Sequence, residues 1–140
     1  MTAVNPPHVL GKLDLAFRAA NKALQQNVTL VPGLRPSHYR LLDFTPTSGI
    51  RLTELARAAN ITKQALGEFV TSLETAGLVD VTTDPNDGRA RLVTPTPAGR
   101  RIQTQIRHTV TAIEQELEQR VGNERWKVFC EVLDALADQP

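Results

Sequence analysis

The sequence predicts a mainly α-helical fold with one small β-hairpin, and two observations lead to this prediction. Apolar residues recur every three or four positions over most of the 140 residues, which is the period of an amphipathic helix. Between two such stretches lie LVDVTT and ARLVT, two β-prone runs separated by the turn-forming residues DPNDGR. The length fits a single domain, residues 1–140.

Two helices are predicted before the centre of the chain. The first runs from Leu10 to Val28, where apolar residues share one face. The second runs from about Ser37 to Phe44, because Pro36 is a favourable first-turn residue. The segment TPTSG then forms a loop.

The segment LTELARAANITKQALGEFVTSLETAGLV predicts two short helices joined by a tight turn. Thr53 and Thr62 are the expected N-caps, and Gly77 is the expected C-terminal cap. The second helix carries an apolar stripe formed by Leu66, Phe69, Val70 and Leu73. This arrangement is typical of a helix-turn-helix.

The C-terminal third predicts two further helices after the hairpin. Thr96 and Pro97 provide an N-cap and a first-turn proline for a helix of about 25 residues, which would span about 38 Å. Gly122 ends it, and a last helix carries apolar residues from Trp126 to Leu136. The terminal helices either pack on one another or interlock with a second chain. We expect the second arrangement, a homodimer, because apolar stripes of this length rarely stay solvated.

Composition limits the classes of function. The start of the chain has no signal-peptide pattern and no stretch is apolar enough for a membrane span, so we expect a cytoplasmic protein. A single cysteine, Cys130, excludes an internal disulfide, and the three scattered histidines indicate no metal site. No catalytic or phosphate-binding motif is present, so we expect no cofactor and no enzyme activity.

Together, the helix-turn-helix and the hairpin resemble the multiple-antibiotic-resistance regulator (MarR) family of winged-helix transcriptional regulators. The resemblance is carried by RLTELARAANITKQALGEFVTSLETAGLV and the wing TTDPNDGRARLVTPTPAGRR, with the family's Asp-Pro-x-Asp-x-Arg motif at residues 84–89. It implies a winged helix-turn-helix at about residues 37–95 and dimerisation helices at about 8–30 and 96–138. It also implies a dimeric repressor that binds double-stranded DNA at a palindromic operator and is often released by a small aromatic or phenolic ligand.

The polar face opposite the apolar stripe is the candidate DNA-reading surface. Gln64 can pair with adenine, Lys63 can reach guanine or a phosphate, and Glu68 can only accept from a cytosine amino group. On the hairpin, Arg89 and Arg91 alternate, and the resemblance assigns minor-groove insertion to Arg89. The candidate DNA-binding residues are Arg51, Thr62, Lys63, Gln64, Gly67, Glu68, Thr71, Asp87, Arg89 and Arg91.

Some positions allow two interpretations. Gly67 either permits close approach to the DNA backbone or is tolerated drift, and Arg35 either frays or moves the start of its helix. Asp87 either orients Arg89 or braces the hairpin. The family's ligand pocket would lie near Phe17, Arg35, His38 and Tyr39, which are otherwise half-buried packing residues.

Two alternative functions remain at this point. Winged helices sometimes bind proteins, and the net charge of +1 is compatible with an interaction module. Cys130 alternatively makes the regulator an oxidant sensor, although Glu131 and Asp134 nearby disfavour a thiolate and the apolar stripe favours a buried thiol.

Overall fold

Six helices and three short strands form the part of the chain that the computed structural model describes, residues 8–138. The helices are α1 (Val9–Gln25), α2 (Pro36–Phe44), α3 (Leu52–Ala59), α4 (Lys63–Thr75), α5 (Pro97–Val121) and α6 (Asn123–Ala137). The strands are β1 (Ile50–Arg51), β2 (Val79–Asp84) and β3 (Asp87–Pro95). The mainly helical fold with a β-hairpin is therefore confirmed, and the α3–α4 pair is the predicted helix-turn-helix.

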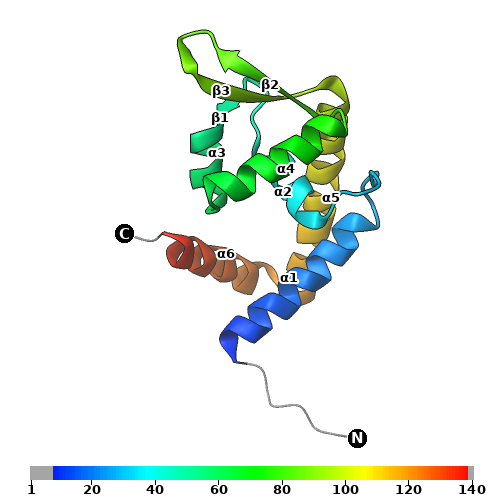
Figure 1. Cartoon of the computed structure of the whole chain (residues 1–140). Coiled ribbons are helices and arrows are strands. Elements are labelled where there is room, and N and C mark those ends of the chain that lie inside the picture. Colours follow the sequence, from blue (N-terminus) through cyan, green and yellow to red (C-terminus); the bar gives the residue numbers. More distant parts are fainter. Residues whose placement is uncertain (1–7, 139–140) are drawn as a thin grey trace, which may run out of the picture.

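Helix α5 connects two ends of the molecule. One end holds the sheet with α2, α3 and α4, and the other holds α1 and α6 (Figure 1). The β2–β3 hairpin projects beyond the helices at the end far from α1. No helix within residues 8–138 is both long enough and apolar enough to cross a membrane.

The sheet is antiparallel with the strand order β1-β3-β2, so the hairpin gains a third strand that the sequence patterns did not predict. Strand β1 has only two residues, which is too short to show an alternating pattern. Ile50 pairs with Val93, and Arg51 pairs with Leu92. The main consequence is that the loop before α3 is fastened to the wing.

Two predicted helix boundaries are wrong. Thr53 is not an N-cap, because α3 begins at Leu52 and the N-cap is Arg51, the last residue paired in β1. The first helix ends at Gln25 rather than Val28. The chain leaves the helix there, and Val28 turns into the core while the Asn27 side-chain amide donates to the Ala23 carbonyl oxygen.

The other predicted caps are confirmed. Oγ1 of Thr62 accepts a hydrogen bond from Ala65 N, and Oγ1 of Thr96 accepts one from Gly99 N, each at 3.1 Å. Gly77 follows α4 with φ of +75°, a conformation that favours glycine. These caps satisfy backbone groups that a helix end would otherwise leave unpaired.

Helix α2 begins at Pro36 without fraying, although Arg35 offers no capping oxygen. Arg35 N donates to Nδ1 of His38 at 2.9 Å, and His38 N donates to the carbonyl oxygen of Arg35 at 2.9 Å. His38 thus supplies the reciprocal half of a cap, three residues into the helix.

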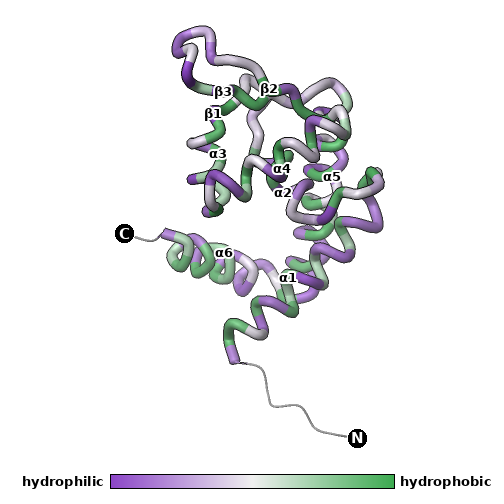
Figure 2. The backbone as a smooth tube through the Cα atoms, in the orientation of Figure 1, coloured by the Kyte–Doolittle hydropathy of each residue, from purple (hydrophilic) through white to green (hydrophobic). Residues whose placement is uncertain are grey.

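One core fills the end of the molecule that holds the sheet. The alternation of apolar and polar residues along α4 and α5 is visible in Figure 2. The core's fully buried large side chains include Leu41, Leu42, Leu55, Leu66, Leu73, Val79 and Val93. All the predicted apolar residues of α4 face this core, with Phe69 half-buried.

Helices α1 and α6 contain no buried residue. Their large apolar side chains are nevertheless numerous, and those that are exposed are Val9, Leu10, Leu13, Leu15, Phe17, Val128, Phe129, Val132, Leu133 and Leu136. Packing within the chain therefore leaves these apolar side chains exposed along both helices.

Candidate nucleic-acid interface

Helix α4 presents its polar side chains outward because its apolar stripe is held in the core. Leu66, Val70 and Leu73 are each at most 4% exposed. The predicted contact residues Thr62, Lys63, Gln64, Glu68 and Thr71 are all exposed, and Gly67 is half-buried. The N-terminal half of α4 therefore offers an ammonium group, an amide and a carboxylate on one accessible face. Such groups can hydrogen-bond to base edges or phosphates.

Gly67 leaves an open gap in this face. A Cβ atom built at Gly67 would meet no other atom within 4 Å. The carbonyl oxygen of Gly67 accepts a hydrogen bond from Oγ1 of Thr71 at 2.8 Å, as in a regular helix with a threonine back-bond. The packing of the chain therefore does not require glycine at this position.

The tip of the hairpin places two of the predicted contact residues side by side. Arg89 is exposed, and its backbone N donates to Oδ1 of Asp87 at 3.1 Å. Of the two roles considered for Asp87, the observed contact is the bracing of the hairpin backbone. Among the described residues, Asp87 forms no ion pair with Arg89.

The pairing of the hairpin becomes irregular toward its tip. Thr83 pairs with Arg91, but the next residue of β2, Asp84, pairs with Asp87. Residues 88–90 of β3 therefore have no partner in β2, and the strand bulges there. The alternation expected for Arg89 and Arg91 therefore does not decide whether their side chains point to the same side of the hairpin. Both side chains are exposed.

Arg51 forms an ion pair with Asp84, the first residue of the Asp-Pro-x-Asp-x-Arg motif, to which the sequence patterns gave no role of its own. Nε and Nη2 of Arg51 contact Oδ2 of Asp84 at 2.9 and 2.8 Å. Oδ1 of Asp84 accepts from Asn86 N at 2.9 Å. These contacts hold the pKa of Asp84 below its ordinary value, chiefly through the Asn86 hydrogen bond and further through Arg51, against the opposing effect of burial. The signal in the sequence was an aspartate directly before a turn proline, a residue suited to bonding the backbone two positions on.

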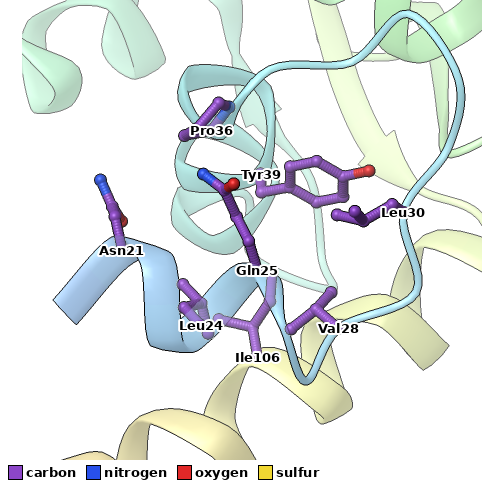
Figure 3. Close-up of a pocket in the computed structure, with 8 residues that line it drawn as sticks. All are labelled: Asn21, Leu24, Gln25, Val28, Leu30, Pro36, Tyr39 and Ile106. Carbon is purple, nitrogen blue, oxygen red and sulfur yellow. The ribbon is translucent and has the colours of Figure 1, made fainter. Parts of the chain in front are cut away.

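Two adjacent hollows lie between α1, α2 and α5. The smaller has a volume of about 20 Å³ and is lined by the side chains drawn in Figure 3, which come from α1, the loop that follows it, α2 and α5. The larger has a volume of about 150 Å³ and is lined by Phe17, Tyr39 and Arg40, among others. The larger one is mostly apolar with a few polar groups, as ligand sites usually are.

The four predicted ligand residues are only partly brought together. Phe17 and Tyr39 line the larger hollow, but Arg35 and His38 line neither. Tyr39 and His38 are buried rather than half-buried, and the Tyr39 hydroxyl oxygen accepts a hydrogen bond from Val31 N at 2.7 Å. Patterns of sequence did not indicate Arg40 or Asp43, which also line the hollow. Burial raises the pKa of Asp43, and the positive charge of Arg107 opposes that rise.

Cys130 is half-buried on α6, beside a helix surface that has no buried residue. Within residues 8–138, no group of three or more histidine, cysteine, aspartate or glutamate residues is arranged to hold a metal ion.

Comparison with known proteins shows which family model the chain matches. The MarR family model matches residues 33–90, from before α2 to the tip of the wing. A search of the curated proteins finds no significant match.

Many solved structures share the fold. The regulator PcaV from Streptomyces coelicolor, solved with its natural ligand, has a TM-score of 0.75 and 21% identity, over 99% of this chain and 98% of that one. NadR, solved with 4-hydroxyphenylacetate, has a TM-score of 0.70 and 21% identity over the full length of both chains. Sco3205, a MarR-family regulator from Streptomyces coelicolor solved with DNA, has a TM-score of 0.68 and 25% identity, over 99% of this chain and 94% of that one.

The family match and the structural likeness agree on the same elements. Residues 33–90 contain α2, both helices of the helix-turn-helix, β2 and the tip of the hairpin. The structural likeness extends to α1, α5 and α6, since it covers nearly the whole chain. Residues 33–90 therefore match the MarR family, and nearly the whole chain shares the fold of solved MarR-family transcriptional regulators, which include one solved with DNA.

Proposed function

We propose that this protein is a cytoplasmic, homodimeric repressor that binds a palindromic operator and is released by a small phenolic ligand. Residues of about 37–95 bind DNA in this proposal, and the helices at about 8–30 and 96–138 form the dimer. The observation that carries it is the pairing of an exposed polar face on α4 with an exposed arginine, Arg89, at the tip of a projecting hairpin.

Helix α4 reads the major groove in this proposal. Its N-terminal half is exposed and carries Lys63 and Gln64, and the partial positive charge of a helix N-terminus favours nearby phosphates. The carboxylate of Glu68 is repelled by phosphates. It therefore restricts α4 to DNA sequences in which a cytosine amino group can donate a hydrogen bond to Glu68. Arg89 enters the adjacent minor groove, where the potential is most negative at narrow A·T-rich steps.

The dimer is formed by α1, α5 and α6. Helices α1 and α6, whose large apolar side chains are exposed, lie at the end of α5 opposite to the hairpin, so a partner can cover these helices without blocking the DNA-reading surface. A twofold dimer presents two equal lobes, and two equal lobes select two inverted half-sites. The long α5 sets the separation between them.

The larger hollow between α1, α2 and α5 is the proposed effector site. Phe17 and Tyr39 offer aromatic surfaces, and Arg40 offers a positive charge for a carboxylate or phenolate. A ligand held there contacts α2, which packs against α4. A shift of α2 would then change the position of α4 relative to its symmetry mate.

The test of DNA binding is a fluorescence-anisotropy titration against labelled DNA from upstream of the protein's own gene. It is run at two salt concentrations, with a shuffled fragment as competitor. We expect tight binding that weakens steeply with salt, because phosphate neutralisation releases counterions, and that the shuffled DNA does not displace. Equal, weak binding to both fragments, together with no site recovered in a genome-wide selection of bound DNA, would contradict the proposal.

A second titration tests the effector. The protein–DNA complex is titrated with hydroxybenzoates and hydroxyphenylacetates, and Phe17→Ala is the matched variant, since its side chain is exposed and lines the hollow. We expect at least one phenol to release the DNA from the wild-type protein and to require a higher concentration with Phe17→Ala. If none of these phenols releases the DNA, and none shows a heat of binding to the protein in calorimetry, the phenolic ligand is removed from the proposal.

A further inference from the structure

We propose that Arg51 and Asp84 position the wing, so that Arg51 acts on DNA through the hairpin rather than as a phosphate contact of its own. The ion pair holds the hairpin tip in the shape in which Arg89 meets the minor groove. The inference rests on the proposed DNA-binding function and names two positioning residues for it.

The ion pair spans the whole width of the sheet. Arg51 lies on β1 and Asp84 on β2, which are the two outer strands, with β3 between them. Adjacent strands are about 4.8 Å apart, so the two backbones are separated by about two such spacings. Only a long side chain closes that gap, and the Arg51 guanidinium does so with two contacts to one carboxylate oxygen, at 2.8 and 2.9 Å.

The hairpin tip has little else to hold it. β1 pairs with β3 only at Val93 and Leu92, which leaves the outer half of β3 next to β2 alone. In that half, residues 88–90 have no partner in β2. Arg89 is one of these three residues, and its backbone is held by the Asp87 side chain. The Asp84 carboxylate is the point where β2, the turn residue Asn86 and Arg51 meet.

Burial makes the two partners depend on one another. The side chain of Asp84 is 7% exposed, so a carboxylate there requires its hydrogen-bond donors. Arg51 is 39% exposed, and its Nε and Nη2 are both engaged by Asp84. Swinging the guanidinium toward a phosphate would break these contacts and loosen the turn that carries Arg89.

A phosphate-contact role and a wing-positioning role for Arg51 predict opposite changes in DNA affinity when Asp84 is replaced by asparagine. Asp84→Asn removes a negative charge close to the DNA-reading surface, and charge alone would strengthen binding to a polyanion. It would also free Arg51 for a phosphate. If Asp84 positions the wing, the same substitution weakens binding, because the single carbonyl oxygen of asparagine cannot replace both the oxygen that accepts from Asn86 N and the oxygen that binds Arg51.

The experiment compares Asp84→Asn with Asp80→Asn, which changes the net charge equally at an exposed position on the same strand. Operator affinity is measured by anisotropy, and circular dichroism melts identify the temperature range in which each protein is folded. We expect Asp84→Asn to weaken binding about tenfold, the scale of one arginine–DNA contact, and Asp80→Asn to leave it unchanged or tighter. If Asp84→Asn binds the operator with the same affinity as Asp80→Asn, the proposal is overturned.

Arg51→Lys gives an independent measurement if Asp84→Asn folds poorly. Lysine keeps the charge and binds phosphate well, but it cannot reproduce contacts through Nε and Nη2. Weakened binding by Arg51→Lys supports positioning, and wild-type affinity identifies a phosphate contact.

A double-mutant cycle with Arg89→Ala tests whether the effect runs through the wing. With Arg89 absent, Asp84→Asn should no longer weaken binding, whereas an equal loss in both backgrounds would show that Asp84 acts elsewhere. Hydrogen exchange of the backbone amides at 86–90 is measured on the protein without DNA. It therefore tests whether Asp84 positions the wing even if the proposed DNA-binding function fails. Faster exchange in Asp84→Asn than in Asp80→Asn is required even if the wild-type protein shows no operator binding.

Discussion

The imidazole of His38 meets the ring of Phe69 edge-on, with the ring centroids 4.9 Å apart and the planes at 80°. This contact joins α2 to the inner side of α4. The same imidazole accepts a hydrogen bond from Arg35 N through Nδ1, so one buried side chain both starts α2 and packs α2 against the DNA-reading helix. Only the neutral imidazole has a lone pair at Nδ1 to accept that bond.

We predict that acidification from pH 8 to 5.5 lowers the free energy of unfolding. Burial is the main cause that lowers the pKa of His38 below 6.5; the hydrogen bond with the Arg35 backbone opposes it, and the Arg35 charge adds a smaller lowering effect. The unfolded chain therefore binds a proton at a higher pH than the folded chain. Stability contributed by neutral His38 is complete above pH 6.5 and is lost as the pH falls through the lower folded pKa.

Urea denaturation at several pH values measures this effect, with His38→Gln as the matched variant. Glutamine can accept the Arg35 bond but does not titrate, so the slope between pH 8 and 5.5 should flatten. The raised pKa of Asp43 gives the opposite dependence on pH between 3.8 and its higher folded pKa, and it does so equally in both proteins. An identical slope in the two proteins would contradict the assignment to His38.

We predict that Gln103→Met destabilises the protein by about 1–3 kcal/mol, the cost of leaving buried acceptors unpaired. Nε2 of Gln103 donates to the carbonyl oxygens of Leu42 and Thr45 at 2.7 and 2.8 Å, at the C-terminal end of α2. Methionine fills a similar volume but donates nothing. Gln115→Met, at an exposed position on the same helix, is the control and should change the unfolding midpoint in urea little.

Two helical glycines should respond to alanine with opposite signs. A Cβ at Gly99 would overlap the carbonyl oxygen of Leu78, so Gly99→Ala should lower the melting temperature and detach the start of α5 from the sheet. A Cβ at Gly67 meets nothing, so Gly67→Ala should raise stability by up to about 1 kcal/mol. Calorimetric melts of both variants check this prediction.

The operator affinity of Gly67→Ala then chooses between the two interpretations of Gly67. Weaker binding by a more stable protein would show that the gap accommodates DNA. Unchanged affinity would show that the glycine is tolerated drift. The free protein does not distinguish the two, since nothing in its packing needs the glycine.

Local patterns predicted those parts of the structure that depend on local chemistry. The caps at Thr62 and Thr96 and the inward stripe of α4 follow from residue type and helical period, and all are confirmed. Strand β1 was missed because two residues carry no period. The predicted Thr53 cap was wrong as a consequence, because Arg51 is held in β1 and α3 begins at the residue after it.

Contacts between distant residues lay beyond that reasoning. Arg51 and Asp84 are 33 positions apart, and only the strand order β1-β3-β2 shows that they face one another. The hollow near Tyr39 depends on where α1 crosses α5, which no periodicity specifies. Of the four predicted ligand residues, Phe17 and Tyr39 accordingly line the hollow, whereas Arg35 and His38 do not.

We predict that Leu133→Glu converts the proposed dimer to monomer at micromolar concentration. Leu133 lies on α6, where no residue is buried within the chain, and its side chain is 37% exposed. A charge in an apolar interface loses hydration without gaining a partner. Sedimentation velocity measures the change, with Glu131→Gln, exposed on the same helix, as the control. A wild-type protein that sediments as a monomer would contradict the proposed dimer.

We predict that Arg89→Ala weakens operator binding by about 1–3 kcal/mol while the fold and the proposed dimer stay intact. Its side chain is exposed and forms no ion pair among the described residues, so its removal leaves no buried group unpaired. If Arg89 neutralises phosphate charge in the minor groove, the slope of log affinity against log salt should also fall by about one. Filter binding at four salt concentrations measures both quantities. Arg120→Ala, which removes an exposed arginine near the far end of α5, is the control for net charge. A loss of affinity in Arg120→Ala equal to that in Arg89→Ala would assign the effect to overall charge, and unchanged affinity in Arg89→Ala would remove the wing from the interface.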